Sequence, residues 1–351
     1  MRGETLADIG IKEIAAKANV SIATVSYVLN GTRNVRPKTR ERVLRVIEEM
    51  NYKPNNAAQS LKRKRTNTIG VIAEDVTVFN VPEIIDGIND CADKLDMHIL
   101  LTNLRLDKRI SRNFDQVDSY RSFAANAVSE LLSKQVDGII YIGIHPRDLT
   151  GLFDTYGKPI VYAYCYTQND VSLQYNDEQA SYDAMAHLVK QGHKRIAVIT
   201  GMMDSIPSRL RFNGFYKAIM EYNLPFDPQL MKMGNWEAES GYRLTMELLE
   251  LNEPPTAILA MNDVMAVGVL RAAAEVGVLI PRELSVIGFD NREFSEYLIP
   301  RISTMDLPLH EIGYQAMESL ALLIKGEPIP NNPLPNCKLI ERDSVAPPLR
   351  L

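Results

Sequence analysis

From about residue 69 onward, short apolar runs rich in β-branched residues alternate with longer amphipathic stretches. Near-continuous apolar strands separated by helices are typical of parallel sheets that helices cover on both faces. We expect strands at residues 69–73, 98–101, 138–142, 160–164, 196–200, 257–260 and 285–288. We expect helices at residues 82–95, 177–191, 209–222, 238–251, 263–276 and 309–325.

This pattern predicts an α/β body large enough for two doubly wound parallel sheets, because 351 residues exceed a single typical core. Ligands of such sheets bind outside the carboxyl ends of the strands. Polar and aromatic residues that follow those strands are therefore the first candidates for a binding site.

The first 54 residues have a different pattern, which predicts a small all-α domain. A first helix places Ile11, Ile14, Ala15 and Ala18 on one face, and a second, after Ser21 as a good N-cap, buries Val25, Val28 and Leu29. A third helix from Pro37 to Met50 offers Val43, Leu44, Ile47 and Met50 to the same core.

Two short helices in this order outline a helix-turn-helix DNA reader. Ile22, Ala23, Ser26 and Tyr27 would project from the first turns of the second helix, where base edges are met, and Ser21 and Thr24 could bind phosphates. An ordinary three-helix bundle with a solvated face is the alternative reading of the helical pattern alone.

Charge favours the DNA-binding interpretation. Residues 1–68 hold 14 Lys and Arg against 6 Asp and Glu, a net charge of +8, whereas the whole chain carries −5. A basic head neutralises phosphates, and an acidic body discourages unspecific binding to nucleic acid.

Other function classes lack their signatures. There is no G-x-G-x-x-G, G-x-S-x-G or H-E-x-x-H motif, and the segment at residues 151–159 has the wrong glycine spacing and a proline where a phosphate loop needs Ser or Thr. The three cysteines are far apart and the five histidines have no metal-ligand spacing, so we expect no enzyme, cofactor, catalytic residue or metal. With no signal peptide and no long apolar run, we expect a cytoplasmic protein.

The order of several motifs resembles the LacI/GalR family of bacterial transcriptional regulators. The motifs are Ile-Lys-Glu-Ile-Ala at 11–15, Val-Ser-x-Ala-Thr-Val-Ser at 20–26, Val-Leu-Asn-Gly at 28–31, Asn-Tyr-Lys-Pro-Asn at 51–55, Val-Asp-Gly-Ile-Ile at 136–140, Gly-His-Lys-Arg-Ile-Ala at 192–197, Arg-Phe-Asn-Gly-Phe at 211–215, Ala-Met-Asn-Asp at 260–263 and Leu-Ser-Val-Ile-Gly-Phe-Asp at 284–290. The resemblance covers about residues 10–347.

The resemblance implies a homodimeric repressor that binds a palindromic operator and whose bilobed, periplasmic-binding-protein-like body closes on a small effector. It implies a DNA-binding domain at 1–54, a hinge helix and linker at 55–68, and a body at 69–351 whose lobes we place at 69–165 with 291–322 and at 166–290 with 323–351. Leu61 would be an apolar wedge in the minor groove, or would simply pack on the body. The implied DNA-binding residues are Ser21, Ile22, Ala23, Thr24, Ser26, Tyr27, Asn30, Arg33, Asn55, Ala57, Ala58, Ser60 and Leu61.

Departures from the family pattern leave the operator sequence open. Ile22, Ala23 and Tyr27 stand where many members carry polar or charged groups, so bidentate contacts by Arg or Gln are missing there. Gly10 also replaces the usual hydroxyl cap of the first helix.

For the effector, Asn262 and Asp290 each follow a predicted strand, Arg211 begins a helix after a strand and loop, and Trp236 follows the turn-like Gly234-Asn235. All four match pocket positions of the family by resemblance, with Asp75, Phe79, Asn176 and Asp177 as further candidates. A tryptophan face under a ring and planar groups that grip hydroxyls suit a sugar or sugar phosphate. The structural alternatives are a bracing Asp–Arg pair and a core tryptophan. A corepressor-dependent regulator of non-sugar metabolism is the second reading, and an exported sugar receptor is disfavoured. The sequence assigns no role to residues 1–9, and for the long 103–131 connection it leaves open a solvated loop, an altered effector entrance or a partner contact.

Overall fold

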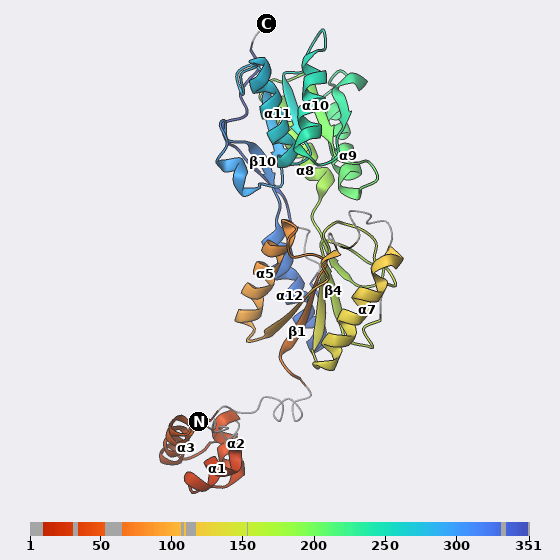
Figure 1. Ribbon diagram of the computed structural model, residues 1–351. Helices are drawn as coiled ribbons and strands as arrows, with labels where there is room; N and C mark the ends of the chain where they lie inside the picture. Colours follow the sequence, from red (N-terminus) through yellow and green to blue (C-terminus); the bar gives the residue numbers. More distant parts are fainter. Residues whose placement is uncertain are drawn as a thin grey trace, which may run out of the picture. The chain divides into compact units, whose positions relative to one another are not determined.

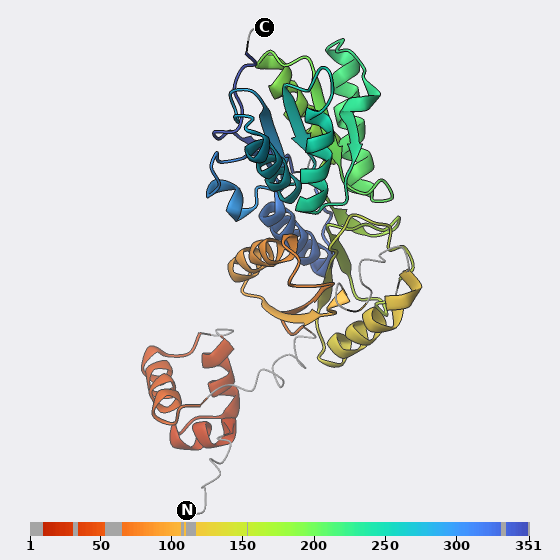
Figure 2. The same ribbon diagram turned by 45° about the horizontal axis from the view of Figure 1, so that its top comes forward.

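The computed structural model describes residues 10–30, 34–52, 65–106, 109, 117–152, 154–330 and 335–349. The chain divides into two compact units, Met1–Thr66 and Asn67–Leu351, which we call the small unit and the large unit. Figures 1 and 2 show the helices of the small unit and the two α/β lobes of the large unit. The expected combination of an all-α head and an α/β body with parallel sheets is confirmed.

The small unit contains α1 (Ile11–Lys17), α2 (Ile22–Asn30) and α3 (Pro37–Glu49). Its buried core side chains are Ile14, Ala15, Ala18, Val25, Val28, Val43 and Val46. The prediction that Leu44 belongs to this core is wrong, since Leu44 is 45% exposed and Val46 takes part in the core instead. On a helix that already buries Val43, position 46 shares its face and position 44 is turned by about 100° away from it.

Local hydrogen bonds define where the first two helices begin. The Glu13 carboxylate accepts the backbone N–H of Gly10 at 2.9 Å, which supplies a polar cap that the glycine itself lacks. Ser21 Oγ accepts the backbone N–H of Thr24 at 3.1 Å, as expected of an N-cap side chain. These bonds satisfy donors that a helix start otherwise leaves without a partner.

The first lobe of the large unit is a parallel five-stranded sheet in the order β2-β1-β3-β4-β5. Its strands are β1 (Thr68–Ala73), β2 (His98–Asn103), β3 (Gly138–Ile142), β4 (Ile160–Ala163) and β5 (Val171–Leu173). The helices α5 (Asn80–Lys94) and α12 (Leu309–Lys325) cover one face, and α7 (Val117–Ser133) covers the other (Figure 1).

The second lobe is a six-stranded sheet in the order β11-β10-β9-β8-β6-β7, in which only β11 runs antiparallel. Its strands are β6 (Ile196–Thr200), β7 (Met231–Met233), β8 (Ala257–Ala260), β9 (Ser285–Phe289), β10 (Ser303–Asp306) and β11 (Lys338–Ile340). Its helices are α8 (Asp177–Lys190), which packs on α9 (Ile206–Glu221), and α10 (Ala238–Leu249), which packs on α11 (Asp263–Val276). Short 3₁₀ turns occupy Pro228–Leu230 and Glu293–Glu296.

Both faces of the central strands are buried, which explains their apolar sequences. In β1, Val71 belongs to the core under α5 and α12, whereas its neighbour Ile72 belongs to the separate core under α7. Alternate side chains of one strand therefore enter two different cores.

Three sequence expectations about the body need correction. Residues 171–173 pair with β4 in the first sheet, and residues 303–306 pair with β9 in the second, so both segments belong to the lobe opposite to the one expected. The 103–131 connection is not one long loop, because α7 begins at Val117. The short strands β5, β7, β10 and β11 were not expected from the sequence, since runs of three or four residues carry too little periodicity.

The last helix, α12, returns to the first lobe and lies in close contact with α5. A Cβ atom added at Gly87 would lie 1.9 Å from the carbonyl oxygen of His310, and one at Gly313 would lie 2.0 Å from that of Ile84. Glycine at both positions allows the two backbones this approach. None of the helices that the structure describes is long and apolar enough to cross a membrane.

Candidate functional site

A cavity of about 330 Å³ lies between the two lobes of the large unit. Its walls come from residues that follow the carboxyl ends of strands in both sheets. The first lobe contributes Thr77, Val78, Phe79, Ile144, His145 and Tyr164, and the second contributes Met202, Pro207, Arg211, Trp236, Glu237, Asn262, Val264, Asp290 and Arg292. This is where the topology of parallel α/β sheets places a ligand.

Arg211 is the most heavily bonded side chain of the cavity and is 3% exposed. From α9, its Nε donates to Asp177 Oδ1 at 2.7 Å, its Nη2 donates to the Tyr175 hydroxyl at 3.0 Å, and its Nη1 donates to the Met261 carbonyl. Its Cζ also lies 3.8 Å from the centroid of the Phe289 ring. Most of its donors are therefore engaged by the protein, which holds the guanidinium in one orientation.

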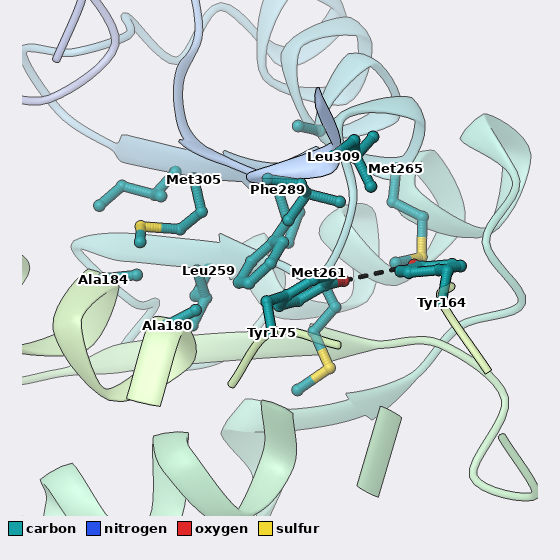
Figure 3. Close-up of a cluster of buried hydrophobic side chains, with 14 of the residues drawn as sticks. Tyr164, Tyr175, Ala180, Ala184, Leu259, Met261, Met265, Phe289, Met305 and Leu309 are labelled. Carbon is teal, nitrogen blue, oxygen red and sulfur yellow. Dashed lines mark hydrogen bonds between the residues drawn. The ribbon is translucent and has the colours of Figure 1, made fainter. Parts of the chain in front are cut away.

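Two side chains that contact Arg211, Phe289 and Tyr175, belong to a cluster of buried hydrophobic side chains that also includes Tyr164 (Figure 3). The hydroxyls of Tyr164 and Tyr175 lie 3.3 Å apart in a hydrogen bond, and their rings stack at 5.8 Å between centroids. Burial raises the pKa of both phenols well above the ordinary value, so both remain neutral donors and acceptors. Of these two tyrosines, Tyr164 lines the cavity and Tyr175 holds Arg211 through its hydroxyl.

Asp290 follows β9 and faces the cavity. Its Oδ1 lies 3.5 Å from Arg211 Nη1, and no side-chain hydrogen bond to the carboxylate is present among the described residues. Burial raises the pKa of Asp290 to about 8, although the positive charge of Arg211 acts in the opposite direction. The backbone of Asp290 has a φ of +101°, a strained conformation for a residue with a side chain, and its N–H donates to Met305.

Trp236 lies on a floor made by Gly201. A Cβ atom at Gly201 would be 2.0 Å from the indole ring, so only glycine allows the ring this position. Asn262 caps α11 by accepting the Met265 N–H at 2.8 Å and donates to the Trp236 carbonyl at 3.0 Å. The indole Nε1 is buried and has no acceptor among the described residues.

Five of the eight predicted effector residues line the cavity, namely Phe79, Arg211, Trp236, Asn262 and Asp290. The other three do not. Asp177 is buried behind Arg211, Asn176 caps α8 by accepting the Gln179 N–H, and Asp75 accepts the N–H and hydroxyl of Thr77 in its own loop.

Several lining residues were not predicted, above all Arg292, His145 and Tyr164. Arg292 and His145 follow the ends of predicted strands, so the strand-end rule could have selected them. Tyr164 was predicted as the last residue of a strand, but the observed β4 ends at Ala163. The described residues contain no group of three or more His, Cys, Asp or Glu side chains that could hold a metal ion.

In the small unit, α2 presents its first turn to solvent. Ser21, Ile22 and Ala23 are exposed, and Thr24, Ser26 and Tyr27 are half-buried. Ser21 Oγ and Thr24 Oγ1 lie 2.9 Å apart. The side chain of Asn30 and the residues Arg33, Asn55, Ala57, Ala58, Ser60 and Leu61 lie outside the described residues.

A helix-turn-helix unit joined to a bilobed α/β unit with a cavity at facing strand ends defines a ligand-responsive DNA-binding regulator. Comparisons with known proteins agree with this class. The model of the bacterial regulatory proteins of the lacI family matches residues 10–55, and the periplasmic binding protein-like domain matches residues 185–345.

Similar proteins span nearly the whole chain. Catabolite control protein A of Priestia megaterium is 32% identical over 326 residues, which cover 92% of this chain and 94% of that protein. The HTH-type transcriptional repressor PurR of Vibrio atlanticus is 31% identical over 320 residues, covering 90% and 92%. The lac repressor dimer bound to operator and the anti-inducer ONPF superposes with a TM-score of 0.78 at 29% identity, covering 96% and 99%. The chain belongs to the LacI family of transcriptional regulators, which bind DNA and are not enzymes.

Proposed function

We propose that this regulator is a repressor that binds a palindromic operator as a homodimer and that a small carbohydrate controls its DNA affinity. The observation that supports the effector class best is the composition of the cavity. An indole ring, a carboxylate, a guanidinium and an amide surround a space of about 330 Å³.

These groups suit a sugar because its two kinds of surface need different partners. The C–H face of a pyranose packs on an aromatic ring, for which Trp236 is placed, and its hydroxyls need planar donors and acceptors, for which Asp290, Arg211 and Asn262 are placed. The volume is at the small end of ligand cavities and fits a monosaccharide or its derivatives.

For DNA, the exposed first turn of α2 supports major-groove binding. Ile22 and Ala23 would contact thymine methyl groups, and the Tyr27 hydroxyl would bond one base edge. We propose that residues 55–62 form the hinge helix and that Leu61 enters the minor groove, which would shift discrimination to DNA shape.

Dimerisation is part of the proposal because the lac repressor, similar over the whole chain, is a dimer on its operator. The loop after β9 exposes Tyr297 by 72% and Ile299 by 97%. Large apolar side chains exposed together are typical of a protein interface.

The test begins with the purified ligand-free chain and selection of bound duplexes from a random pool. Recovery of two half-sites around a flexible central step is the expected result. Addition of neutral and charged sugars to the complex should then change DNA affinity, and a ligand at 100 times its Kd should stabilise the large unit by about 2.7 kcal/mol.

The opposite outcomes are equally clear. If specific duplexes are enriched only after a cell extract is added, the corepressor-dependent alternative is favoured. If a purine base raises the melting temperature and no sugar does, the effector is not a carbohydrate and belongs to another class.

A further inference from the structure

We propose that the effector is an anionic carbohydrate and that Arg292 binds its carboxylate or phosphate group. This inference rests on the carbohydrate site proposed above and adds to it the charge of the ligand. It depends on a guanidinium of the cavity whose side-chain donors have no hydrogen-bond acceptor among the residues that the structure describes.

The backbone of Arg292 is held firmly in place at the end of β9. Its N–H donates to Asp263 Oδ2 at 2.7 Å. Asp263 is fully buried and also accepts the hydroxyls of Ser295 and Thr304, each at 2.7 Å. This network fixes the point from which the Arg292 side chain enters the cavity.

The guanidinium of Arg292 is bordered by aromatic rings. Its Cζ lies 4.6 Å from the centroid of Phe79 in the first lobe and 5.5 Å from that of Phe294. Among the described residues, no carboxylate, carbonyl or hydroxyl accepts a hydrogen bond from its side chain. Contact with an aromatic ring uses the charge of a guanidinium but none of its five N–H donors. These donors form a planar fork whose geometry matches a carboxylate or phosphate.

The other arginine of the cavity, Arg211, provides an internal comparison. Asp177, Tyr175 and Met261 accept hydrogen bonds from Arg211, and the Asp290 carboxyl lies 3.5 Å from its Nη1, so the protein itself engages most of the donors of this guanidinium. A new anion would gain little there. Arg292 retains both its charge and its donors.

The acidic groups of the cavity do not compensate Arg292 by contact. The Asp290 carboxyl lies 3.5 Å from Arg211 Nη1, and no hydrogen bond or ion pair between its side chain and that of Arg292 is present among the described residues. Glu237 follows β7, which lies three strand positions from β9 in the sheet order, or about 14 Å at the usual spacing between strands. Trp236 follows β7 and Arg292 follows β9, so the two side chains come from opposite ends of the row of strands β9-β8-β6-β7. A ligand whose ring packs on Trp236 and whose anion reaches Arg292 would contact both.

The test is a titration of the full chain with matched ligands. Each hexose, starting with glucose and galactose, is offered as the neutral sugar, the uronic acid and the 6-phosphate, with inorganic phosphate and hypoxanthine as further probes. Binding is measured by calorimetry and by the fluorescence of Trp236, the only tryptophan. The variants are Arg292→Gln, Arg292→Lys and, as a surface control in the same lobe, Arg282→Gln.

We expect a charged derivative to bind wild type at least 10-fold more tightly than its neutral parent. Arg292→Gln should lose about 10- to 100-fold in affinity for the charged ligand, the range expected for a hydrogen-bonded charge, and change affinity for the neutral sugar little. Arg292→Lys keeps the positive charge but loses the planar donors, so its affinity for the charged ligand should lie between those of wild type and Arg292→Gln. Arg282→Gln should bind like wild type. Preference for the uronic acid or for the 6-phosphate identifies which anion is bound.

Equal affinity for neutral and charged sugars overturns the inference and leaves the carbohydrate proposal intact. A preference for the charged ligand that survives in Arg292→Gln overturns the role of Arg292. Binding of hypoxanthine and of no sugar overturns the carbohydrate proposal and this inference with it. If Arg292→Gln does not fold, the same comparison is decided with Arg292→Lys.

Discussion

Replacement of Asp290 by Asn should change how the stability of the large unit depends on pH. Burial raises the pKa of this carboxyl from 3.8 to about 8 in the folded chain. In the unfolded chain the pKa returns to its ordinary value, so the folded protein binds a proton that the unfolded protein releases. The contribution of this carboxyl to the free energy of unfolding is fully present below about pH 4 and is lost as the pH rises toward 8.

The size of the effect follows from the same shift. Each pH unit between the two pKa values is worth at most about 1.4 kcal/mol, so wild type should lose about 3 kcal/mol relative to Asp290→Asn between pH 5 and pH 7. Asn resembles the protonated carboxyl and does not titrate. Two further carboxyls whose pKa burial raises, Asp177 and Asp263, are present in both proteins, so the comparison of wild type with Asp290→Asn reports on position 290.

Urea unfolding at several pH values, followed by Trp236 fluorescence, measures this difference. The indole lines the same cavity as Asp290, so its fluorescence reports the unfolding of the second lobe, which contains both residues. Asp204→Asn, at an exposed position before α9, is the control and should run parallel to wild type at all pH values. If the difference between wild type and Asp290→Asn is constant from pH 5 to pH 8, the carboxyl is ionised in the folded chain and the reasoning is refuted.

Three further substitutions test other parts of the molecule. Leu61→Ala should weaken operator binding at least 10-fold and unspecific binding hardly at all, because phosphate contacts dominate the latter; equal losses in filter binding would reject the wedge. Ile14→Ala removes a fully buried side chain and should cost the small unit 2–5 kcal/mol by circular dichroism without moving the Trp236 transition. Gly201→Ala forces the indole from its floor and should cost about 1–3 kcal/mol and shift Trp236 emission, whereas unchanged emission would contradict the packing described here.

The elements that the sequence predicted well are those with long periodic patterns. The helices α11 and α12 begin and end where the pattern predicts, and β6 and β8 do likewise. The short strands escape prediction because pairing with a neighbour, rather than local preference, makes them strands. Residues 303–306 are an example, since β10 exists through its pairing with β9 and β11.

The candidate site follows the same division. The order of strands and helices was enough to bring Asn262 and Asp290 to one edge of a sheet, because carboxyl ends of parallel strands converge there. Trp236 follows β7, a strand that the sequence did not predict, and was a candidate through its turn-like approach and the family resemblance. It could not decide which residue of a neighbouring pair faces the cavity. Asp177 was a reasonable candidate, but it lies behind Arg211, where a buried carboxylate orients the guanidinium that does reach the cavity.

Arg292 shows most directly why the rest could not be predicted. The strand-end rule includes Arg292 among many polar residues, but a charged residue three positions after a strand is solvated in most proteins. Its position in the sequence therefore does not show that its side chain enters the cavity. Phe79, which approaches from the opposite lobe, and the buried Asp263, which holds the Arg292 backbone, make this arginine part of the cavity. Both partners are distant in the sequence, so the feature that bears on ligand charge exists only once the two lobes have folded together.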